Sequence, residues 1–341
     1  MKKNILIISL IIVLPLLLTA EIFPKVGTAG AQFLKIGIDA RAIGMGEAYT
    51  AVSDDISSVF WNPAGLCLKK QSQVILSHTE WVADIRHEFL AASQFYDFGA
   101  LAFSVSFLHM GEMDVTTVEQ FGPTGEKFSC YDLAAGLTYS YKFTDKFSFG
   151  FTGKYIREEL DTFTSNGFAF DLGSLYNTGY KNVTIGMAMR NFGPDMEYDI
   201  DEDGDGIFDE DPFDLLDNDG DGKIDEDREE MPFKIPMNFS LGISGEIFSD
   251  DNSYLLASLQ LDSYVDREET YNLGGEYKIN LLRLRTGYQF GYDAAGFNAG
   301  FGLLIPTSYA IYAVDYSYSD FGDLSESTIK TPHRITIKLM F

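Results

Sequence analysis

The chain has 341 residues, including 28 Phe, 19 Tyr and 32 Gly, a composition that favours many β-strands with tight turns over a helical bundle. Its net charge of −26 is concentrated in one segment. Residues 195–230 hold 19 acidic and two basic residues, which leaves −9 for the rest of the chain. Because there is no basic patch to neutralise phosphates, nucleic acid is excluded as a partner.

The first 20 residues have the layout of a secretory signal peptide. Met1-Lys-Lys-Asn4 supplies a positively charged start, residues 5–18 are apolar, and Thr19-Ala20 supplies small residues before the expected cleavage point. The apolar stretch is shorter than the roughly 20 residues that a membrane-spanning helix needs. The sequence therefore predicts export, with residues 1–20 removed as a signal peptide.

Residues 27–66 do not alternate between polar and apolar side chains. They read as loops and short helical turns, and Ser53–Leu66 resembles a capped helical turn that Pro63 ends. Gly44 and Gly46 lack the third glycine and the strand–helix frame of a dinucleotide-binding loop. We therefore expect a compact segment without a nucleotide site.

From residue 73 onward, large apolar residues alternate with small or polar ones, as in strands with two different faces. Phe147, Phe149 and Phe151, for example, alternate with Ser148 and Gly150. The second face carries Gly, Ala, Ser and Thr in place of the Lys and Glu of a solvated sheet, which favours a crowded polar lumen. Fourteen strands are predicted, at residues 73–81, 86–96, 99–108, 128–142, 146–157, 167–176, 182–191, 235–248, 253–264, 269–279, 283–290, 296–304, 308–318 and 332–341.

The connections between these strands alternate in length. Every second connection is short, as at 97–98 and 143–145, and such turns lie at the periplasmic end of outer-membrane barrels. The connections at the other end include four long ones, at 109–127, 158–166, 192–234 and 319–331. The predicted fold class is thus all-β: a 14-stranded antiparallel transmembrane β-barrel in contact with outer-membrane lipid. Since such a barrel is too wide for wall side chains to fill, we expect residues 21–72 to form an N-terminal plug and residues 73–341 the barrel.

The final strand fits this architecture. Ile335, Ile337, Leu339 and Phe341 share one face, and residues 334, 336 and 338 share the other. A last strand of this kind closes a barrel and presents its apolar face to lipid.

Several motifs resemble the PorV/PorQ family of outer-membrane proteins. They are residues 37–55, Trp61-Asn-Pro-Ala-Gly-Leu66, His78–Arg86, Phe168–Gly173 and Arg190–Asp195. The resemblance covers most of residues 27–194. It implies a barrel like that of FadL-type channels, whose N-terminal hatch carries a similar Asn-Pro-Ala, and a location in the cell outer membrane.

The family resemblance also implies a function. PorV is a non-enzymatic component of the type IX secretion system, so the expected partners are secreted cargo proteins or other secretion-system components. The alternative is a FadL-like channel for uptake of hydrophobic small molecules, for which a plugged barrel is equally suitable. A third interpretation is a structural surface protein whose acidic segment binds neighbours.

No residue pattern indicates catalysis. The four histidines lack the spacing of a zinc site, and there is no Gly-x-Ser-x-Gly motif. Asp132, Lys154, Arg190 and Asp262 are expected to line the lumen, where such residues form structural pairs more often than catalytic groups.

The acidic segment contains a repeat, because residues 201–211 and 217–227 are identical at eight of eleven positions. Each copy has the Asp-x-Asp-x-Asp-Gly pattern of a calcium loop, in which carboxylates converge on one hard cation and glycine permits a sharp turn. Position twelve is Pro212 or Arg228, so no bidentate glutamate closes either site; the plainer interpretation is a solvated acidic loop. The predicted Ca²⁺ ligands are Asp201, Asp203, Asp205, Asp209, Asp217, Asp219, Asp221 and Asp225.

The chain has two cysteines. Cys67 precedes the first predicted strand at its periplasmic end, whereas Cys130 lies near the outer end of the fourth. The roughly 30 Å height of the hydrocarbon core far exceeds the reach of a disulfide, so both thiols are expected to be free.

Overall fold

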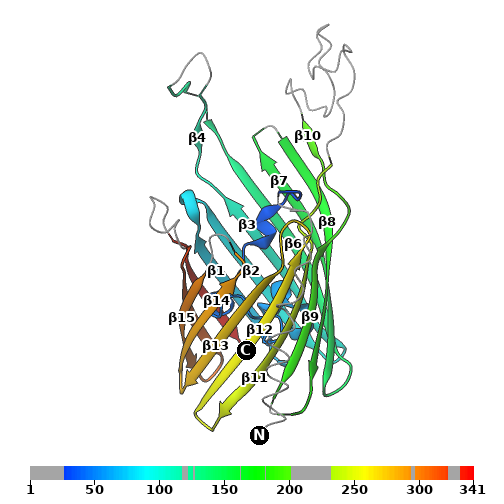
Figure 1. Ribbon diagram of the computed structural model, residues 1–341, viewed down its shortest axis with the longest axis vertical. Coiled ribbons are helices and arrows are strands. Elements are labelled where there is room, and N and C mark those ends of the chain that lie inside the picture. Colours follow the sequence, from blue (N-terminus) through cyan, green and yellow to red (C-terminus); the bar gives the residue numbers. More distant parts are fainter. Residues whose placement is uncertain are drawn as a thin grey trace.

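Fourteen antiparallel strands close into a barrel in the computed structural model (Figure 1), which describes residues 27–116, 122–125, 127–161, 163–180, 182–200, 232–292, 296–321 and 331–341. Each strand pairs with its neighbours along the chain, and β1 closes the ring against β17, with Gln73 opposite Met340 and Glu80 opposite His333. The strands are β1 (Gln73–Glu80), β2 (Arg86–Tyr96), β3 (Gly99–His109), β6 (Cys130–Lys142), β7 (Phe147–Leu160), β8 (Phe163–Asn177), β9 (Thr184–Phe192), β11 (Asn238–Ser249), β12 (Ser253–Tyr264), β13 (Thr270–Ile279), β14 (Leu282–Phe290), β15 (Phe297–Pro306), β16 (Ile311–Ser319) and β17 (His333–Met340). The predicted 14-stranded barrel is confirmed.

One predicted loop is wrong. Residues 158–166 were expected to form a long connection, but β7 and β8 stay paired up to Leu160 and Phe163. The residues around Glu158 are polar on both faces, so alternation could not identify them as strand. A strand that extends beyond the hydrocarbon no longer needs an apolar outer face. At this end β10 (Tyr198–Ile200) extends the barrel sheet by pairing with β8. The strands β4 (Met113–Asp114) and β5 (Lys127–Phe128) form a separate two-stranded sheet.

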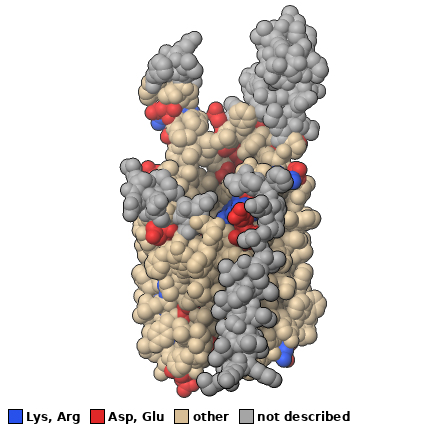
Figure 2. All heavy atoms as spheres, in the orientation of Figure 1, with Lys and Arg blue, Asp and Glu red and all other residues tan. Residues whose placement is uncertain are grey.

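The apolar stripes face outward. On β6, Leu137 is 68% exposed whereas the adjacent Thr138 is 2% exposed, and β17 repeats the pattern with Ile337 and Lys338 at 47% and 2%. The wall visible in Figure 2 is accordingly almost free of charged atoms between its two ends. None of the helices among the described residues combines the length and apolar character that a membrane-spanning helix requires.

The N-terminal segment, residues 27–72, lies within the barrel (blue in Figure 1). Its elements are η2 (Gln32–Lys35), α2 (Ala40–Gly44), α3 (Ser58–Trp61) and η3 (Pro63–Gly65), and a further turn, η4 (Val82–Asp84), joins β1 to β2. Tyr49 and Trp61 are among its fully buried side chains and pack edge to face. The segment thus has its own apolar centre, which is enclosed by the inner face of the wall.

The two ends of the barrel differ. Short connections join β2 to β3, β6 to β7, β8 to β9, β11 to β12, β13 to β14 and β15 to β16 at one end, here named the turn end. The other end, the loop end, carries the three long connections, from β3 to β6, from β9 to β11 and from β16 to β17, and the β7–β8 hairpin rises there. In outer-membrane barrels the end that carries the short turns is the periplasmic one.

Candidate functional site

Glycines of the wall leave room for the Asn62-Pro63-Ala64 motif. A Cβ atom added at Gly173 would lie 2.1 Å from Asn62 Oδ1, and one at Gly150 would lie 2.2 Å from the Pro63 carbonyl carbon. Both distances are shorter than atoms can approach, so any larger residue would push the motif away from β7 and β8. The small residues on the inner strand faces are therefore needed for close packing of the N-terminal segment.

Asn62 fixes this contact by hydrogen bonds. Its Nδ2 donates to the Thr50 carbonyl at 2.9 Å and to the Ser174 carbonyl on β8 at 3.1 Å, and its Oδ1 accepts from the Ala64 amide at 3.2 Å. The side chain is fully buried. An asparagine supplies both donor and acceptor at one position, which neither aspartate nor leucine can do.

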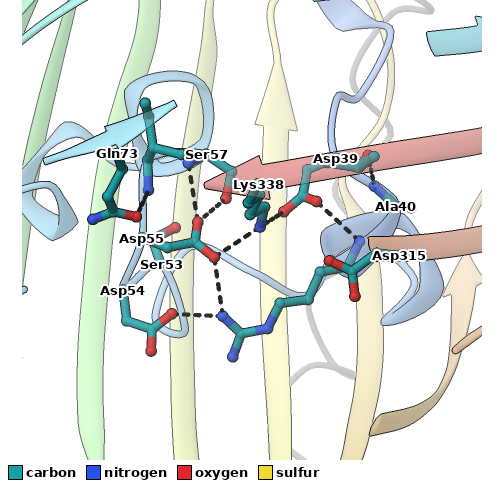
Figure 3. Close-up of polar contacts among 12 residues, drawn as sticks. Asp39, Ala40, Ser53, Asp54, Asp55, Ser57, Gln73, Asp315 and Lys338 are labelled. Carbon is teal, nitrogen blue, oxygen red and sulfur yellow. Dashed lines mark hydrogen bonds and ion pairs between the residues drawn. The ribbon is translucent and has the colours of Figure 1, made fainter. Parts of the chain in front are cut away.

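Lys338 on β17 joins the N-terminal segment to the last strand (Figure 3). Its Nζ lies 2.7 Å from Asp39 Oδ2 and 2.7 Å from Asp55 Oδ2. The exposed fractions of the three side chains are 2% for Lys338, 0% for Asp39 and 5% for Asp55. One buried ammonium therefore holds two carboxylates that lie sixteen residues apart in the chain.

Arg41 extends this network around the wall. Its guanidinium binds Glu276 of β13 in a bidentate manner, at 2.9 and 3.0 Å, and donates to Asp54 at 2.6 Å. Glu276 also accepts from Arg285 of β14 at 2.7 Å, and Arg285 donates to Asp315 of β16 at 2.6 Å. A continuous chain of ion pairs thus runs from the N-terminal segment through three strands.

Burial and neighbouring charge act differently on the two acids that Lys338 holds. Burial raises the pKa of Asp39 above its usual value, and Lys338 only partly offsets this effect. Burial also acts to raise the pKa of Asp55, but Lys338 and Arg41 together outweigh it and hold that pKa well below the usual value. Asp55 is therefore the firmly ionised partner of the network.

Two cavities lie on opposite sides of the N-terminal segment. The loop-end cavity has a volume of about 940 Å³, and its lining includes Trp81, Glu158, Arg267 and Arg334. The turn-end cavity has a volume of about 460 Å³, and its lining includes Lys69, Arg283, Asp315 and Lys338. The charge network thus borders the turn-end cavity.

The predicted lumen residues make structural contacts. Lys154 pairs with Asp171 at 2.6 Å, the Arg190 guanidinium lies 5.3 Å from the Phe60 ring centre, and Asp262 accepts hydrogen bonds from Gln260. Asp132 lines the loop-end cavity. Cys67 and Cys130 are both free, as predicted.

The predicted calcium ligands, Asp201 to Asp225, lie outside the described residues, as does the predicted signal peptide. Within the parts of the chain that the structure does describe, no three His, Cys, Asp or Glu side chains are grouped to hold a metal ion. Sequence reasoning missed Glu276, Arg285 and Asp315 as members of the ion-pair network that starts at Arg41. Their only signal was a charged residue on the inward face of a strand.

Solved structures of hydrocarbon channels share this architecture. The Pseudomonas putida toluene transporter TodX aligns with a TM-score of 0.54 and 13% identity, over 88% of this chain and 95% of TodX. The monoaromatic hydrocarbon channel CymD aligns with a TM-score of 0.51 and 11% identity, over 89% of this chain and 97% of CymD. These similarities show the fold: a closed antiparallel β-barrel of the kind found in the two channels.

A family model adds the narrower identification. The model for the type IX secretion system protein PorV matches residues 20–216, more than half of the sequence. The chain therefore belongs to the PorV family. The match includes every residue of the N-terminal segment that contributes to the charge network. A search of curated protein sequences found no match.

Proposed function

We propose that this chain is a non-enzymatic outer-membrane component of type IX protein secretion, which binds exported proteins or other secretion-system components at its loop end. The match of residues 20–216 to the PorV family is the observation that carries this proposal. The match extends over the Asn62 motif and the Asp39, Arg41 and Asp55 contacts, so the part of the chain that resembles PorV is the part that organises the lumen.

In this proposal the N-terminal segment acts as a plug. Arg41 and Lys338 are nearly inaccessible to solvent and each holds two or more acidic groups, so displacing the segment would leave several charges buried without partners. Breaking one buried pair costs about 3–5 kcal/mol. A plug held in this way favours a role in which partners bind at the rim and do not pass through the barrel.

Affinity capture from native outer membranes tests the secretion role. A tag placed at the N-terminus of the mature chain would be used, with membranes from the untagged strain as the control. Co-purification of exported proteins or a sortase supports the proposal. Recovery of hydrophobic small molecules without any secretion component contradicts it and supports the uptake alternative.

The calcium assignment also stays a proposal. Two acidic repeats support it, and extracellular sites of this kind bind at about 10⁻⁴–10⁻³ M. Calorimetric titration of the full chain with CaCl₂ should show two sites that disappear when Asp201, Asp203, Asp217 and Asp219 are changed to asparagine. The matched control changes Asp250 to asparagine in the β11–β12 turn at the opposite end. Unchanged calcium binding in the fourfold variant would refute the assignment.

A further inference from the structure

The loop-end cavity contains charges without the close ion pairs that Lys338 and Arg285 make. Around the turn-end cavity, Lys338 and Arg285 each contact a carboxylate within 2.7 Å. In the loop-end cavity, Glu158 and Arg334 are equally buried, at 6% and 2% exposed, yet neither forms an ion pair with any described residue. A cavity of about 940 Å³ is within the usual range for a site that accepts a small ligand.

The acidic side of the cavity lies on the tall part of the wall. Asp132 of β6 and Glu158 of β7 stand directly opposite each other in the strand register. Like charges in that position destabilise a sheet. Glu158 accepts a hydrogen bond from the Tyr198 hydroxyl at 3.3 Å, and among the described residues no lysine or arginine is close enough to neutralise either acid. Acidic atoms are visible within the hollow at the loop end in Figure 2.

The basic side of the cavity comes from other parts of the rim. Arg334 of β17 lies over the Trp81 ring at 5.3 Å, and its Nε has no hydrogen-bond partner in the described structure. Arg267 is held between the rings of Tyr264 and Tyr292, at 3.9 and 4.3 Å from their centres, and its Nε is likewise unpaired. A guanidinium that is stacked and partly unpaired is well placed to bind a carboxylate.

Glu47 lines the same cavity. Its backbone is in the left-handed region, with φ of 62°. This conformation is energetically unfavourable for any residue that has a side chain. Its carboxylate forms no ion pair with Arg267 or Arg334 within the described part of the chain. Glu47 therefore acts on Arg267 and Arg334 through space only and leaves their unpaired Nε donors without an acceptor.

We propose that the loop-end cavity binds a peptide segment that carries one basic side chain and one carboxylate. The basic group would lie between Asp132 and Glu158, the carboxylate at Arg334 and Arg267, and the apolar part against Trp81. A ligand that carries both charges would provide an oppositely charged partner for the two acids and for the two arginines at once. This inference does not depend on the secretion role, because it rests on the cavity alone.

Binding of a defined peptide to the purified full-length protein tests the inference. The probe is N-acetylated lysyl-alanyl-phenylalanine with a free carboxylate, and the fluorescence of Trp81 reports its binding. Two analogues each remove one charge: norleucine replaces the lysine, or an amide replaces the carboxylate. Each analogue should bind at least about tenfold more weakly than the probe, as expected for loss of a charge-assisted contact.

Variants assign each charge to its side of the cavity. Changing Asp132 to asparagine together with Glu158 to glutamine should weaken the probe about tenfold and leave the norleucine analogue unaffected. Arg334→Gln should weaken the probe and leave the amide analogue unaffected. The matched control is Glu159→Gln, one residue along β7 on the outer face, where the side chain pairs with Arg157.

Three results would overturn the inference. The first is no fluorescence change with the probe up to about 10 mM, a concentration that would detect even a weak site. The second is equal binding of the probe and both analogues. The third is equal weakening of the probe by the double variant at Asp132 and Glu158 and by Glu159→Gln, which would show that the effect is not specific to the inner face.

Discussion

Replacing Lys338 with methionine should loosen the N-terminal segment from the last strand. Lys338 lies 2.7 Å from both Asp39 and Asp55, and all three side chains are at most 5% exposed. Removing one partner of a buried pair costs about 3–5 kcal/mol, because the remaining charge stays out of water. Asp55 keeps Arg41 at 3.3 Å, so the lower figure of about 3 kcal/mol is expected.

Cys67 provides the assay. It lies in the same segment and is 3% exposed, and the other thiol, Cys130, can be changed to serine to give a single reactive site. A buried thiol reacts only when the surrounding structure opens, so its labelling rate measures the free energy of that opening. A loss of about 3 kcal/mol corresponds to labelling that is roughly 100-fold faster in the Lys338→Met variant.

Two further variants make the Lys338 result interpretable. Lys146→Met removes an exposed lysine of the β6–β7 turn at the turn end and should leave the labelling rate within about twofold of the parent. Adding Asp39→Asn to Lys338→Met removes a buried carboxylate that has lost its partner, so the double variant should label more slowly than Lys338→Met alone. Equal labelling rates in the parent and Lys338→Met would refute the proposed role of the ion pairs.

The same assay checks two other predictions. Gly173→Ala places a Cβ 2.1 Å from Asn62 Oδ1 and should speed Cys67 labelling about tenfold, whereas Gly153→Ala, with no atom nearer than 3.9 Å, should not. Opening of the N-terminal segment should also increase below about pH 4. The pKa of Asp55 is lower in the folded protein than in the unfolded chain, where it is near 3.9. The ion pairs of Asp55 therefore stabilise the fold fully above that unfolded pKa, and this stabilisation is lost as the pH falls through the folded pKa. An Asp55→Asn variant should flatten this profile; a parent profile that is already flat would contradict the assignment.

The barrel could be predicted from the sequence because lipid imposes a simple rule on it. Every spanning strand must present apolar residues outward, so residues such as Leu137 and Ile337 mark its position with period two. The rule fails where lipid ends. The strands of the β7–β8 hairpin continue to Leu160 and Phe163 beyond the region that alternation could identify.

The partners within the lumen could not be predicted in the same way. Alternation places Lys338 and Glu276 on inward faces, but it does not say which residues they meet across the barrel. Those contacts depend on how the N-terminal segment folds, and that segment has no periodic pattern because it is enclosed on every side. The family resemblance identified the relevant residues, such as Asp39 and Asn62, without indicating what they bind.

Ion conductance across a planar bilayer tests most directly whether the N-terminal segment closes the lumen. The full-length chain should insert without steady conductance, and a chain that lacks residues 27–66 should conduct once its barrel has been shown to fold. Lys338→Met should show intermittent openings between these limits. A steady, open conductance from the full-length chain would contradict the account.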